Sequence, residues 1–187
     1  MAFYLLTLPL FGQSKRNKVE PIVEFSLNSE VGSLRAVPVQ ISKEESAILV
    51  VYSADKDIDP WIEMFYPPTD QLKFALYTNK GKLLWKKELK TCTLNGIWFT
   101  PVFPFDLDNN GVDEIYFVNN IDSVHILSYE NLRLEALDSK TGKSLGQWPW
   151  KRTVTNGSNS KTFRNFIFGG YSNGEPVLVT AQGTYGR

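Results

Sequence analysis

Short runs rich in β-branched and aromatic residues recur along the chain, and Asn, Asp, Gly and Pro separate them. No stretch keeps the three- to four-residue spacing of apolar positions that is typical of an amphipathic helix. Many short strands with turn residues between them predict an all-β sandwich, barrel or propeller. The clearest strand candidates are residues 47–52, 74–77, 82–85, 114–118, 132–137 and 176–181.

Internal repetition favours the propeller. Residues 74–89 read FALYTNKGKLLWKKEL, and residues 134–150 read LEALDSKTGKSLGQWPW. Each is an alternating strand, a turn with Gly-Lys and a second strand that contains Trp, so each predicts a β-hairpin with Gly81 or Gly142 at the position of positive φ. The hairpins start 60 residues apart, which is enough for one four-stranded blade and a long loop. The sequence therefore predicts antiparallel blades of a partial β-propeller.

The number of blades is small for this fold. Residues 13–187 provide about three blades, whereas propellers close with roughly four to eight. We therefore expect an incomplete circle, a fragment of a larger propeller, whose open sheet edges could support self-association.

The first residues have a different character. Residues 2–11 are mostly apolar and a polar segment follows, which makes residues 1–12 a candidate signal peptide and predicts a secreted or periplasmic protein. A mostly apolar run of ten residues is too short to span a bilayer. Lys15, Arg16 and Lys18 follow the apolar run instead of preceding it, so a first buried strand or a truncated start remains the alternative.

Composition excludes several function classes. Lys plus Arg and Asp plus Glu each total 20, so there is no net positive charge to attract nucleic acid or an anionic membrane surface. Cys92 is the single cysteine, and no internal disulfide can form. Aromatic residues make up 13% of the chain, which suits strand packing and also stacking on sugar rings.

One turn has the spacing of a cation-binding loop. Residues 106–114 read DLDNNGVDE, with carboxylates at the first and third positions, an amide at the fifth and Gly111 at the sixth. The candidate ligands of a structural Ca²⁺ are Asp106, Asp108, Asn110, the carbonyl of Val112, and Glu114 or Asp113. Phe117 stands where an EF-hand has its bidentate Glu, and strands flank the turn. The alternative is a hydrogen-bonded Asx turn without metal.

Candidate catalytic side chains are few. His125, the only histidine, follows the predicted strand 114–118 in a polar segment, and a lone His is more often structural than catalytic. No second His accompanies it to suggest a transition-metal site, and no G-x-S-x-G motif marks a nucleophilic serine. The tract 161–170, KTFRNFIFGG, fits either an acidic-sugar site or a strand with Arg164 and Asn165 at its polar edge.

Taken together, these segments resemble the propeller-type polysaccharide lyases, most closely the ulvan lyases and more distantly the rhamnogalacturonan lyases. The resemblance covers residues 74–187, the N-terminal portion of such an enzyme. It rests on FPFDLDNNGVDEIYFVNN, LEALDSKTGKSLGQWPW, TFRNFIFGG and GEPVLVTAQGTYGR. The last of these, following TFRNF, is the most specific, because unrelated propellers also carry Asp-rich turns and Gly-Lys hairpins.

The resemblance implies cleavage of a uronate-containing, ulvan-like polysaccharide by β-elimination. A cation or an Arg neutralises the uronate carboxylate, a base removes the C5 proton, and an acid protonates the departing O4 oxygen. The resemblance implies proton transfer by His125 and Tyr185, with Arg164 and Arg187 as candidates to neutralise the carboxylate. Two alternatives remain: a non-catalytic propeller that binds or scaffolds and carries a structural Ca²⁺, and a quinone-dependent dehydrogenase propeller, for which no cofactor-binding residues are evident.

Overall fold

A computed structural model describes residues 21, 23–59, 67–123, 125, 128, 130–150 and 163–183. These residues form β-strands and no α-helix, and among them is no helix long and apolar enough to cross a membrane. The candidate signal peptide, residues 1–12, lies outside the described residues. The strands are β1 (Ser33–Gln40), β2 (Ser46–Ser53), β3 (Lys73–Thr78), β4 (Leu83–Glu88), β5 (Val102–Phe105), β6 (Glu114–Asn120), β7 (Leu132–Asp138), β8 (Ser144–Pro149), β9 (Asn165–Ser172) and β10 (Glu175–Gln182).

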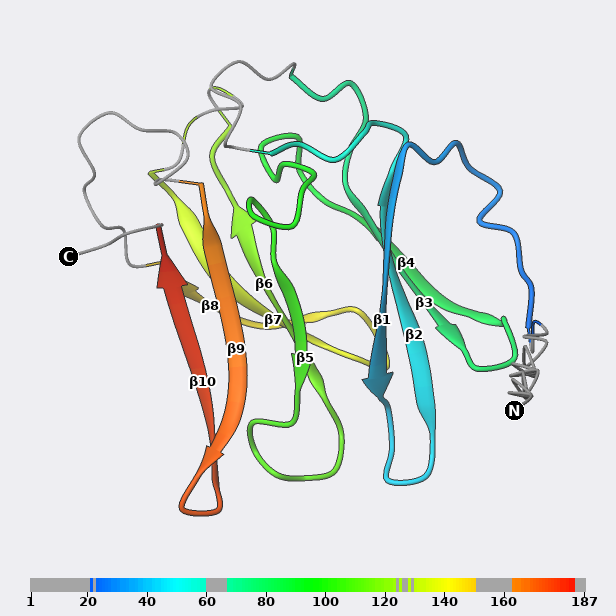
Figure 1. Cartoon of the computed structure of the whole chain (residues 1–187), viewed down its shortest axis with the longest axis vertical. Coiled ribbons are helices and arrows are strands. Elements are labelled where there is room, and N and C mark those ends of the chain that lie inside the picture. Colours follow the sequence, from blue (N-terminus) through cyan, green and yellow to red (C-terminus); the bar gives the residue numbers. More distant parts are fainter. Residues whose placement is uncertain are drawn as a thin grey trace, which may run out of the picture.

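The strands form three antiparallel sheets. Two sheets have four strands each, in the sequential orders β1-β2-β3-β4 and β5-β6-β7-β8, and the third pairs β9 with β10. The first strands of the sheets, β1, β5 and β9, contact one another in turn, so the sheets stack side by side around these strands (Figure 1). This is the arrangement of consecutive propeller blades, with β1, β5 and β9 innermost. The predicted all-β partial propeller of about three blades is confirmed.

Every proline within these strands lies on a strand at the edge of its sheet: Pro38 on β1, Pro104 on β5, Pro149 on β8 and Pro176 on β10. A proline has no N–H to donate to a neighbouring strand, so only edge strands accept it without losing a ladder hydrogen bond. The proline positions therefore agree with the order of the strands in each sheet.

The two predicted hairpins have the same local structure. The β3–β4 register shifts between Leu76 and Tyr77, and the β7–β8 register shifts at the equivalent place, between Ala136 and Leu137. Both turn glycines have positive φ, 78° at Gly81 and 67° at Gly142. The shared bulge and turn show that the hairpins are equivalent parts of two blades. Of the six predicted strand runs, each falls on a strand, with only Lys82 outside β4.

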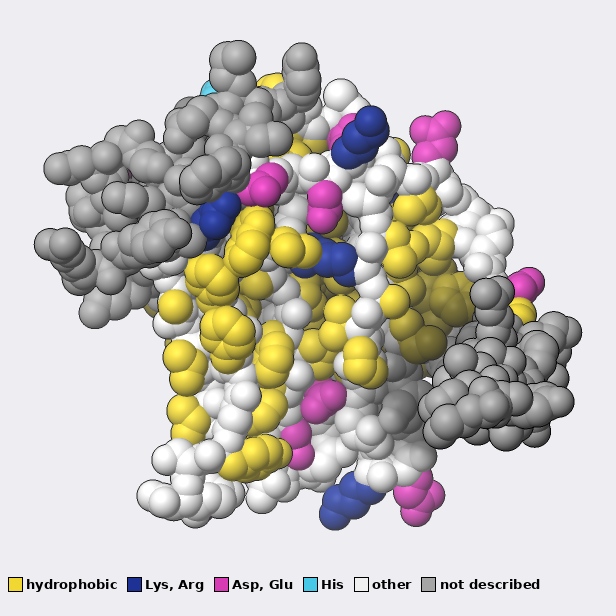
Figure 2. Space-filling view, viewed as in Figure 1, with side chains coloured by type: hydrophobic (Ala, Val, Ile, Leu, Met, Phe, Trp, Pro, Cys, Tyr) yellow, Lys and Arg dark blue, Asp and Glu magenta, His cyan; other side chains and the backbone are white. Residues whose placement is uncertain are grey.

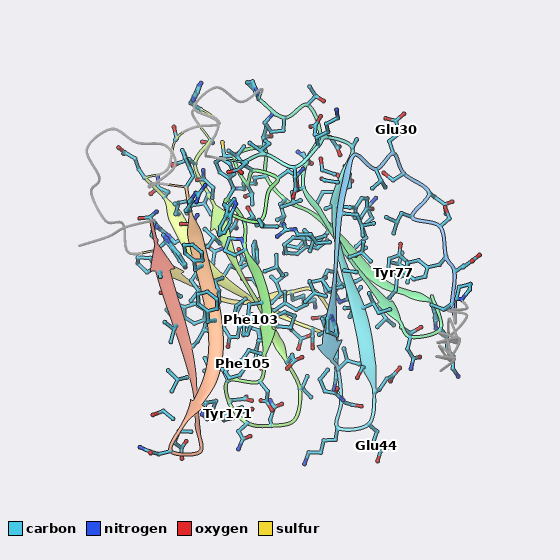
Figure 3. The ribbon with its side chains drawn as sticks, viewed as in Figure 1. Glu30, Glu44, Tyr77, Phe103, Phe105 and Tyr171 are labelled. Atoms are coloured by element: carbon cyan, nitrogen blue, oxygen red, sulfur yellow. The ribbon has the colours of Figure 1, made fainter. Side chains whose placement is uncertain are left out.

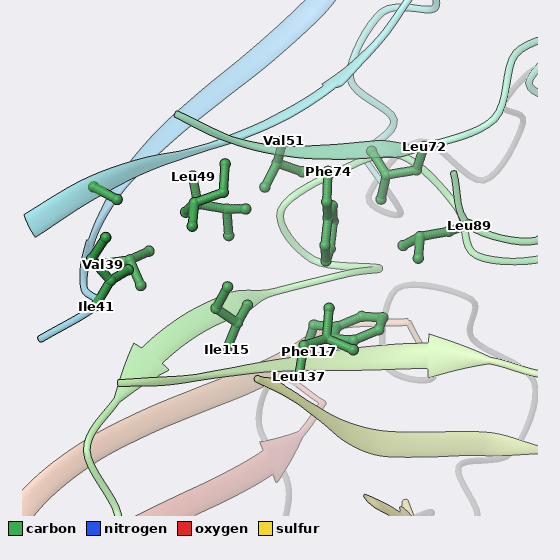
Figure 4. Packing of buried hydrophobic residues seen from close by; sticks show 12 residues of the cluster. Val39, Ile41, Leu49, Val51, Leu72, Phe74, Leu89, Ile115, Phe117 and Leu137 are labelled. Atoms are coloured by element: carbon green, nitrogen blue, oxygen red, sulfur yellow. The ribbon is translucent and has the colours of Figure 1, made fainter. Parts of the chain in front are cut away.

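The main core lies in the seam between the first two blades. Leu49, Phe74 and Leu76 on one sheet face Ile115 and Phe117 on the other, and all five are fully buried. Figure 4 shows Leu49 and Phe74 on one side and Ile115 and Phe117 on the other, meeting between the two sheets. The Phe74 and Phe117 rings lie 5.1 Å apart in an edge-to-face arrangement, which aromatic pairs favour. A second cluster, built around Tyr116, Val118 and Ile167, fills the seam between the second and third blades.

Hydrogen bonds lock the first seam at its inner and outer ends. At the inner end, the backbone of Gln40 exchanges bonds with Asp113: its N–H donates to Asp113 Oδ2 at 2.7 Å, and its carbonyl accepts from the Asp113 N–H at 2.8 Å. At the outer end, Trp85 Nε1 on β4 donates to the carbonyl oxygen of Ser139, in the β7–β8 turn, at 2.7 Å. The relative position of the two blades is thus fixed by directional bonds as well as by apolar packing.

The contribution of the hydrogen bond from Trp85 to the free energy of unfolding can be measured. Trp85→Phe keeps an aromatic ring but removes the donor to a buried carbonyl, so we expect the free energy of unfolding to fall by about 1–3 kcal/mol. Trp148→Phe on β8 is the matched control, because Trp148 is 48% exposed. Urea unfolding of both variants measures the difference, and equal losses would show that the inter-blade bond contributes nothing.

Candidate functional site

Chemistry-bearing side chains gather at one edge of the blades. The innermost strands β1, β5 and β9 all begin at this edge (Figure 1). Arg35 is the third residue of β1, Arg164 immediately precedes β9, and His125 follows the end of β6. The predicted cation-binding turn between β5 and β6 lies at the opposite edge. The tertiary structure therefore separates the candidate catalytic groups from the candidate metal ligands.

Arg164 has the most defined surroundings of the sequence-predicted site residues. Its side chain is 15% exposed, and its Nη2 lies 3.7 Å from Asp59 Oδ1. Its guanidinium carbon lies 5.1 Å from the centre of the Trp98 ring, within cation–π range. Arg164 is thus held between an aromatic face and a carboxylate, which leaves a positive group at the edge where an acidic ligand could compete with Asp59.

The segment 98–100, which carries the Trp98 ring, is held by β9. The Asn165 N–H donates to the Trp98 carbonyl at 2.9 Å, and Asn165 Nδ2 donates to the Phe99 carbonyl at 3.1 Å. The predicted strand over residues 161–170 is confirmed from Asn165 onward, but Asn165 is fully buried and does not lie at an exposed polar edge. The Asn165 side-chain amide is buried because it bonds a backbone carbonyl of the connection between β4 and β5.

The loop that carries Asp57 and Asp59 is held in place by Asn95 and Gly96, in the connection between β4 and β5. Asn95 Nδ2 lies within hydrogen-bonding distance of the carbonyl oxygens of Asp55, at 3.2 Å, and Lys56, at 3.0 Å. Gly96 has a φ of 127°, and a Cβ at this position would lie 2.3 Å from the Ile58 carbonyl oxygen. Only glycine permits this approach, so Gly96 sets how close the acidic loop comes to the inner strands.

His125 is exposed, as a proton-transfer residue must be to reach a ligand, and its backbone carbonyl accepts a 3.5 Å hydrogen bond from Cys92 Sγ. Tyr185 and Arg187 lie outside the described residues. Gly183, whose N–H donates to the Arg164 carbonyl at 2.7 Å, lies beside Arg164. The structure thus brings the end of β10 to Arg164 and puts His125 at the same edge.

Sequence reasoning missed a buried polar network under this edge. Asn119 Nδ2 and Gln147 Nε2 both donate to Glu135 Oε2, at 2.6 and 2.8 Å, and Thr93 Oγ1 donates to Asn119 Oδ1 at 2.7 Å. Glu135, Asn119 and Thr93 are all buried. The network ties the connection between β4 and β5 to the second blade, and with it the segment that carries Trp98. The signal in the sequence was weak, because Glu135 occupies an ordinary position in an alternating strand.

Aromatic side chains continue from the edge along the inner strands. The Phe105 ring lies 5.9 Å from Phe103 and 5.8 Å from Tyr171, and the three side chains lie together between β5 and β9 (Figure 3). Tyr171 is 63% exposed, and Phe168 on the same strand is 54% exposed. Figure 2 shows hydrophobic side chains over β5, β9 and β10, with charged groups of both signs toward the edge where the inner strands begin.

The predicted cation-binding turn is closed by its own hydrogen bonds. Asp106 accepts from the N–H groups of Asn110, at 2.9 Å, and Gly111, at 2.7 Å, while Asp108 Oδ2 accepts from Asn110 Nδ2 at 2.9 Å. Gly111 has a φ of 88°, as the sharp turn requires. The described residues contain no group of three His, Cys, Asp or Glu side chains arranged to hold a metal ion. Calcium binding at this turn therefore stays a prediction.

Negative charge is nonetheless concentrated at this turn. Burial raises the pKa of Glu114, and the charges of Asp108 and Asp106 add to the rise. Burial also raises the pKa of Asp113, with a further contribution from Asp106. A carboxyl group whose pKa is raised on folding lowers stability at pH values above the raised pKa, because the folded state disfavours its ionised form. A cation bound at this turn would offset that cost.

The fold is similar to those of two solved structures. The crystal structure of the exotype rhamnogalacturonan lyase YesX aligns with a TM-score of 0.70 and 22% identity, over 82% of this chain and 29% of that chain. A rhamnogalacturonan lyase PL11 from Bacillus licheniformis aligns with a TM-score of 0.68 and 19% identity, over 82% and 30% of the two chains. No protein-family model and no curated protein matches the sequence. The chain thus spans less than a third of either lyase, and the likeness establishes the fold.

Gly96 provides a test of how the edge is held together. Gly96→Ala forces a Cβ against the Ile58 carbonyl at a left-handed φ, so we expect the free energy of unfolding to fall by about 1–3 kcal/mol. Gly170→Ala is the control, because a Cβ there has no neighbour within 4 Å. Denaturant unfolding compares the two variants, and a Gly96→Ala protein as stable as the control would contradict the close packing of the acidic loop.

Calcium binding is tested by melting the protein in calcium and in excess chelator. A cation at 100 times its dissociation constant would stabilise the fold by about 2.7 kcal/mol. The gain should be larger at neutral pH than near pH 4, because the ligands must be ionised. Asp108→Ala should abolish the gain. Asp106→Ala should also destabilise the protein in chelator because the Gly111 N–H loses its acceptor, whereas the Asn110 N–H keeps Asp108 Oδ1. Identical melting in calcium and chelator would refute the site.

Proposed function

We propose that this chain is part of a lyase that cleaves a uronate-containing polysaccharide by β-elimination. The observation that carries the proposal is the fold, which is shared with two rhamnogalacturonan lyases of known structure. A guanidinium on an aromatic face, Arg164 over Trp98, lies at the edge where the innermost strands begin, and this supports an acidic ligand. The sequence resemblance favours an ulvan-like polymer and the fold favours rhamnogalacturonan, and both polymers carry uronates.

The chemistry requires three groups. A uronate carboxylate makes the neighbouring C5–H bond acidic only when its negative charge is neutralised, because the charge that develops on deprotonation spreads onto that carboxylate. A base takes the C5 proton, the C4–O4 bond breaks as a C4=C5 double bond forms, and an acid gives a proton to O4. Each proton transfer by a positioned group contributes about 10²–10⁴ in rate.

Three side chains are assigned roles in this proposal. Arg164 neutralises the carboxylate, since a guanidinium can offer two parallel N–H donors to it. Its present partner, Asp59, is 50% exposed and 3.7 Å away, so an incoming carboxylate can replace it. His125, exposed at the same edge, and Tyr185 are proposed to transfer the protons, and Arg187 is the second candidate for neutralisation.

A non-catalytic propeller that binds acidic polysaccharide is the second candidate function. It is favoured by the exposed aromatic side chains of β9, Phe168 and Tyr171, which can stack on sugar rings without any catalytic group. In this alternative, Arg164 and the exposed aromatic side chains of β9 bind the polymer, and calcium at the 106–114 turn is structural. Binding without elimination distinguishes it from the lyase.

The deciding experiment mixes the purified chain with ulvan, rhamnogalacturonan and a neutral galactan. Elimination is followed through the ultraviolet absorbance of the unsaturated uronate, and binding through affinity electrophoresis. For a lyase we expect absorbance to rise with one or both acidic polymers, and His125→Ala to lower the rate by about 10²-fold or more. Arg164→Gln should weaken both binding and turnover, whereas Lys140→Gln, an exposed cation at the opposite edge, should change neither.

The outcomes separate the two candidate functions. Absorbance that rises with ulvan alone, or with rhamnogalacturonan alone, identifies the polymer. Slower migration in gels that contain an acidic polysaccharide, without a rise in ultraviolet absorbance, supports the binding module. A chain that neither binds nor cleaves an acidic polymer would overturn both.

A further inference from the structure

The third blade has an apolar face that is open to solvent. Alternation along β9 and β10 divides their side chains between two faces, and one of these, with Gly169 and Tyr171, lies against the aromatic rings of β5. On the opposite face, Phe168 and Val179 are 54% and 52% exposed. We call this face the outer face of the third blade, and its members are Phe166, Phe168, Gly170, Val177, Val179 and Ala181.

Gly170 interrupts the outer face for no reason found in the described part of the chain. Its φ lies outside the left-handed region, and a Cβ at this position would have no neighbour within 4 Å. A glycine inside a strand lowers stability, and it often marks a place where another group approaches the backbone closely. The open space above Gly170, beside the exposed ring of Phe168, therefore indicates contact with another molecule.

Gly169 shows what such a position accepts in this fold. A Cβ there would lie 2.6 Å from the Phe103 side chain and 2.7 Å from that of Phe105, so two rings from β5 cover this glycine in the seam. These two phenylalanines are two positions apart on their strand. The outer face has the same pair, Phe166 and Phe168, whose rings stack 6.0 Å apart at 15°. It thus carries both a glycine without a covering ring and a ring of the matching kind.

The other end of the row of blades is covered by the chain itself. Val50 and Tyr52 belong to the apolar face of the first sheet that turns away from the second blade. Phe25 stacks on Tyr77 of this face at 4.3 Å, and Leu27 packs on the same cluster. The N-terminal segment runs along this sheet in Figure 1. A head-to-tail contact between two copies would have to displace this segment, so two copies can meet more easily through their third blades.

We propose that the outer face of the third blade binds the same face of a second copy of this chain, with Phe168 of each copy covering Gly170 of the other. A two-fold axis between the faces makes the two contacts equivalent, which is the arrangement of an isologous dimer. Val179 pairs with Phe168 across the sheet, and Val177 pairs with Gly170, so these valines also meet. No member of the outer face is charged, so like charges do not oppose the contact.

The size of the face sets the expected affinity. Strands β9 and β10 have eight residues each, which gives a face about 27 Å long and about 10 Å wide. This is less than the surface of about 800 Å² per partner that a standard interface buries. We therefore expect a weak dimer with a dissociation constant of about 0.1 mM.

The test is sedimentation equilibrium of the full chain without polysaccharide, from about 10 μM to about 1 mM, either side of the expected dissociation constant. The average mass should rise from that of one chain toward that of two. Phe168→Ala should weaken association by about tenfold or more, because it removes the central ring from both equivalent contacts. A chain that stays monomeric throughout this range would overturn the inference.

Gly170→Leu distinguishes a fitted contact from general stickiness. The new side chain fills the space that Phe168 of the second copy should occupy, so a fitted dimer is weakened, whereas non-specific apolar adhesion is strengthened. Phe168→Ala combined with Gly170→Leu exchanges the large and the small side chain and should restore part of the association. Thermal melting should show no loss of stability in Gly170→Leu, because its Cβ has open space. Stronger association of Gly170→Leu would contradict the fit.

Tyr171→Ala is the matched control. Tyr171 is on the same strand and 63% exposed, but its ring lies on the opposite face, 5.8 Å from Phe105, so association should not change. The inference does not depend on the proposed function, because no polysaccharide enters the measurement. If the chain is monomeric and Phe168→Ala weakens retention by polysaccharide gels, the outer face binds sugar instead, and the inference fails while the proposed function stands.

Discussion

Apolar contact between stacked sheets is the interaction on which the rest of this structure depends. The sheet of β5 to β8 is apolar on both faces: Ile115, Phe117 and Leu137 face the first blade, and Tyr116 and Val118 face the third. A sheet of this kind cannot stand alone in water, because burying one face still leaves the other exposed. Stacking blade on blade is the arrangement that buries both, and it sets the inner strands β1, β5 and β9 side by side.

The polar edge of the blades follows from that stacking. Toward the edge where the inner strands begin, the seam changes from apolar side chains to the buried network around Glu135 and to the guanidinium of Arg35. Buried polar groups of this kind lower stability unless they are paired, and they concentrate where function requires them. The apolar part of the seam holds the blades together, so the edge can carry groups that packing does not need.

The two edges of the blades carry different groups. One holds Arg35, Arg164 and His125, whereas the other holds the carboxylates of Asp106, Asp113 and their neighbours. Asp57 and Asp59 lie near Arg35 and Arg164, so charged groups of both signs meet at the edge where the inner strands begin.

Much of the fold was determined by the sequence itself. Alternation and Gly-Lys turns fix the β3–β4 and β7–β8 hairpins, because strand pairing across a short turn depends on neighbouring residues. Strand β1 was not predicted from the sequence, because Arg35 and Pro38 interrupt its apolar run. The strand accepts Pro38 because it lies at the edge of its sheet. Its edge position depends on which sheets stack, and that information is spread over the whole chain.

The site was decided mainly by tertiary structure. Sequence reasoning selected Arg164 and His125 as site residues, and the structure puts both at one edge. Sequence reasoning did not find Arg35, Trp98 or Gly96, because no local pattern distinguishes them from ordinary strand and loop residues. Arg35 and Thr100 are 65 positions apart in the sequence and meet only when the first and second blades pack together. Local sequence therefore determined the hairpins and turns, while the packing of whole blades, a long-range property, determined which charged groups share an edge.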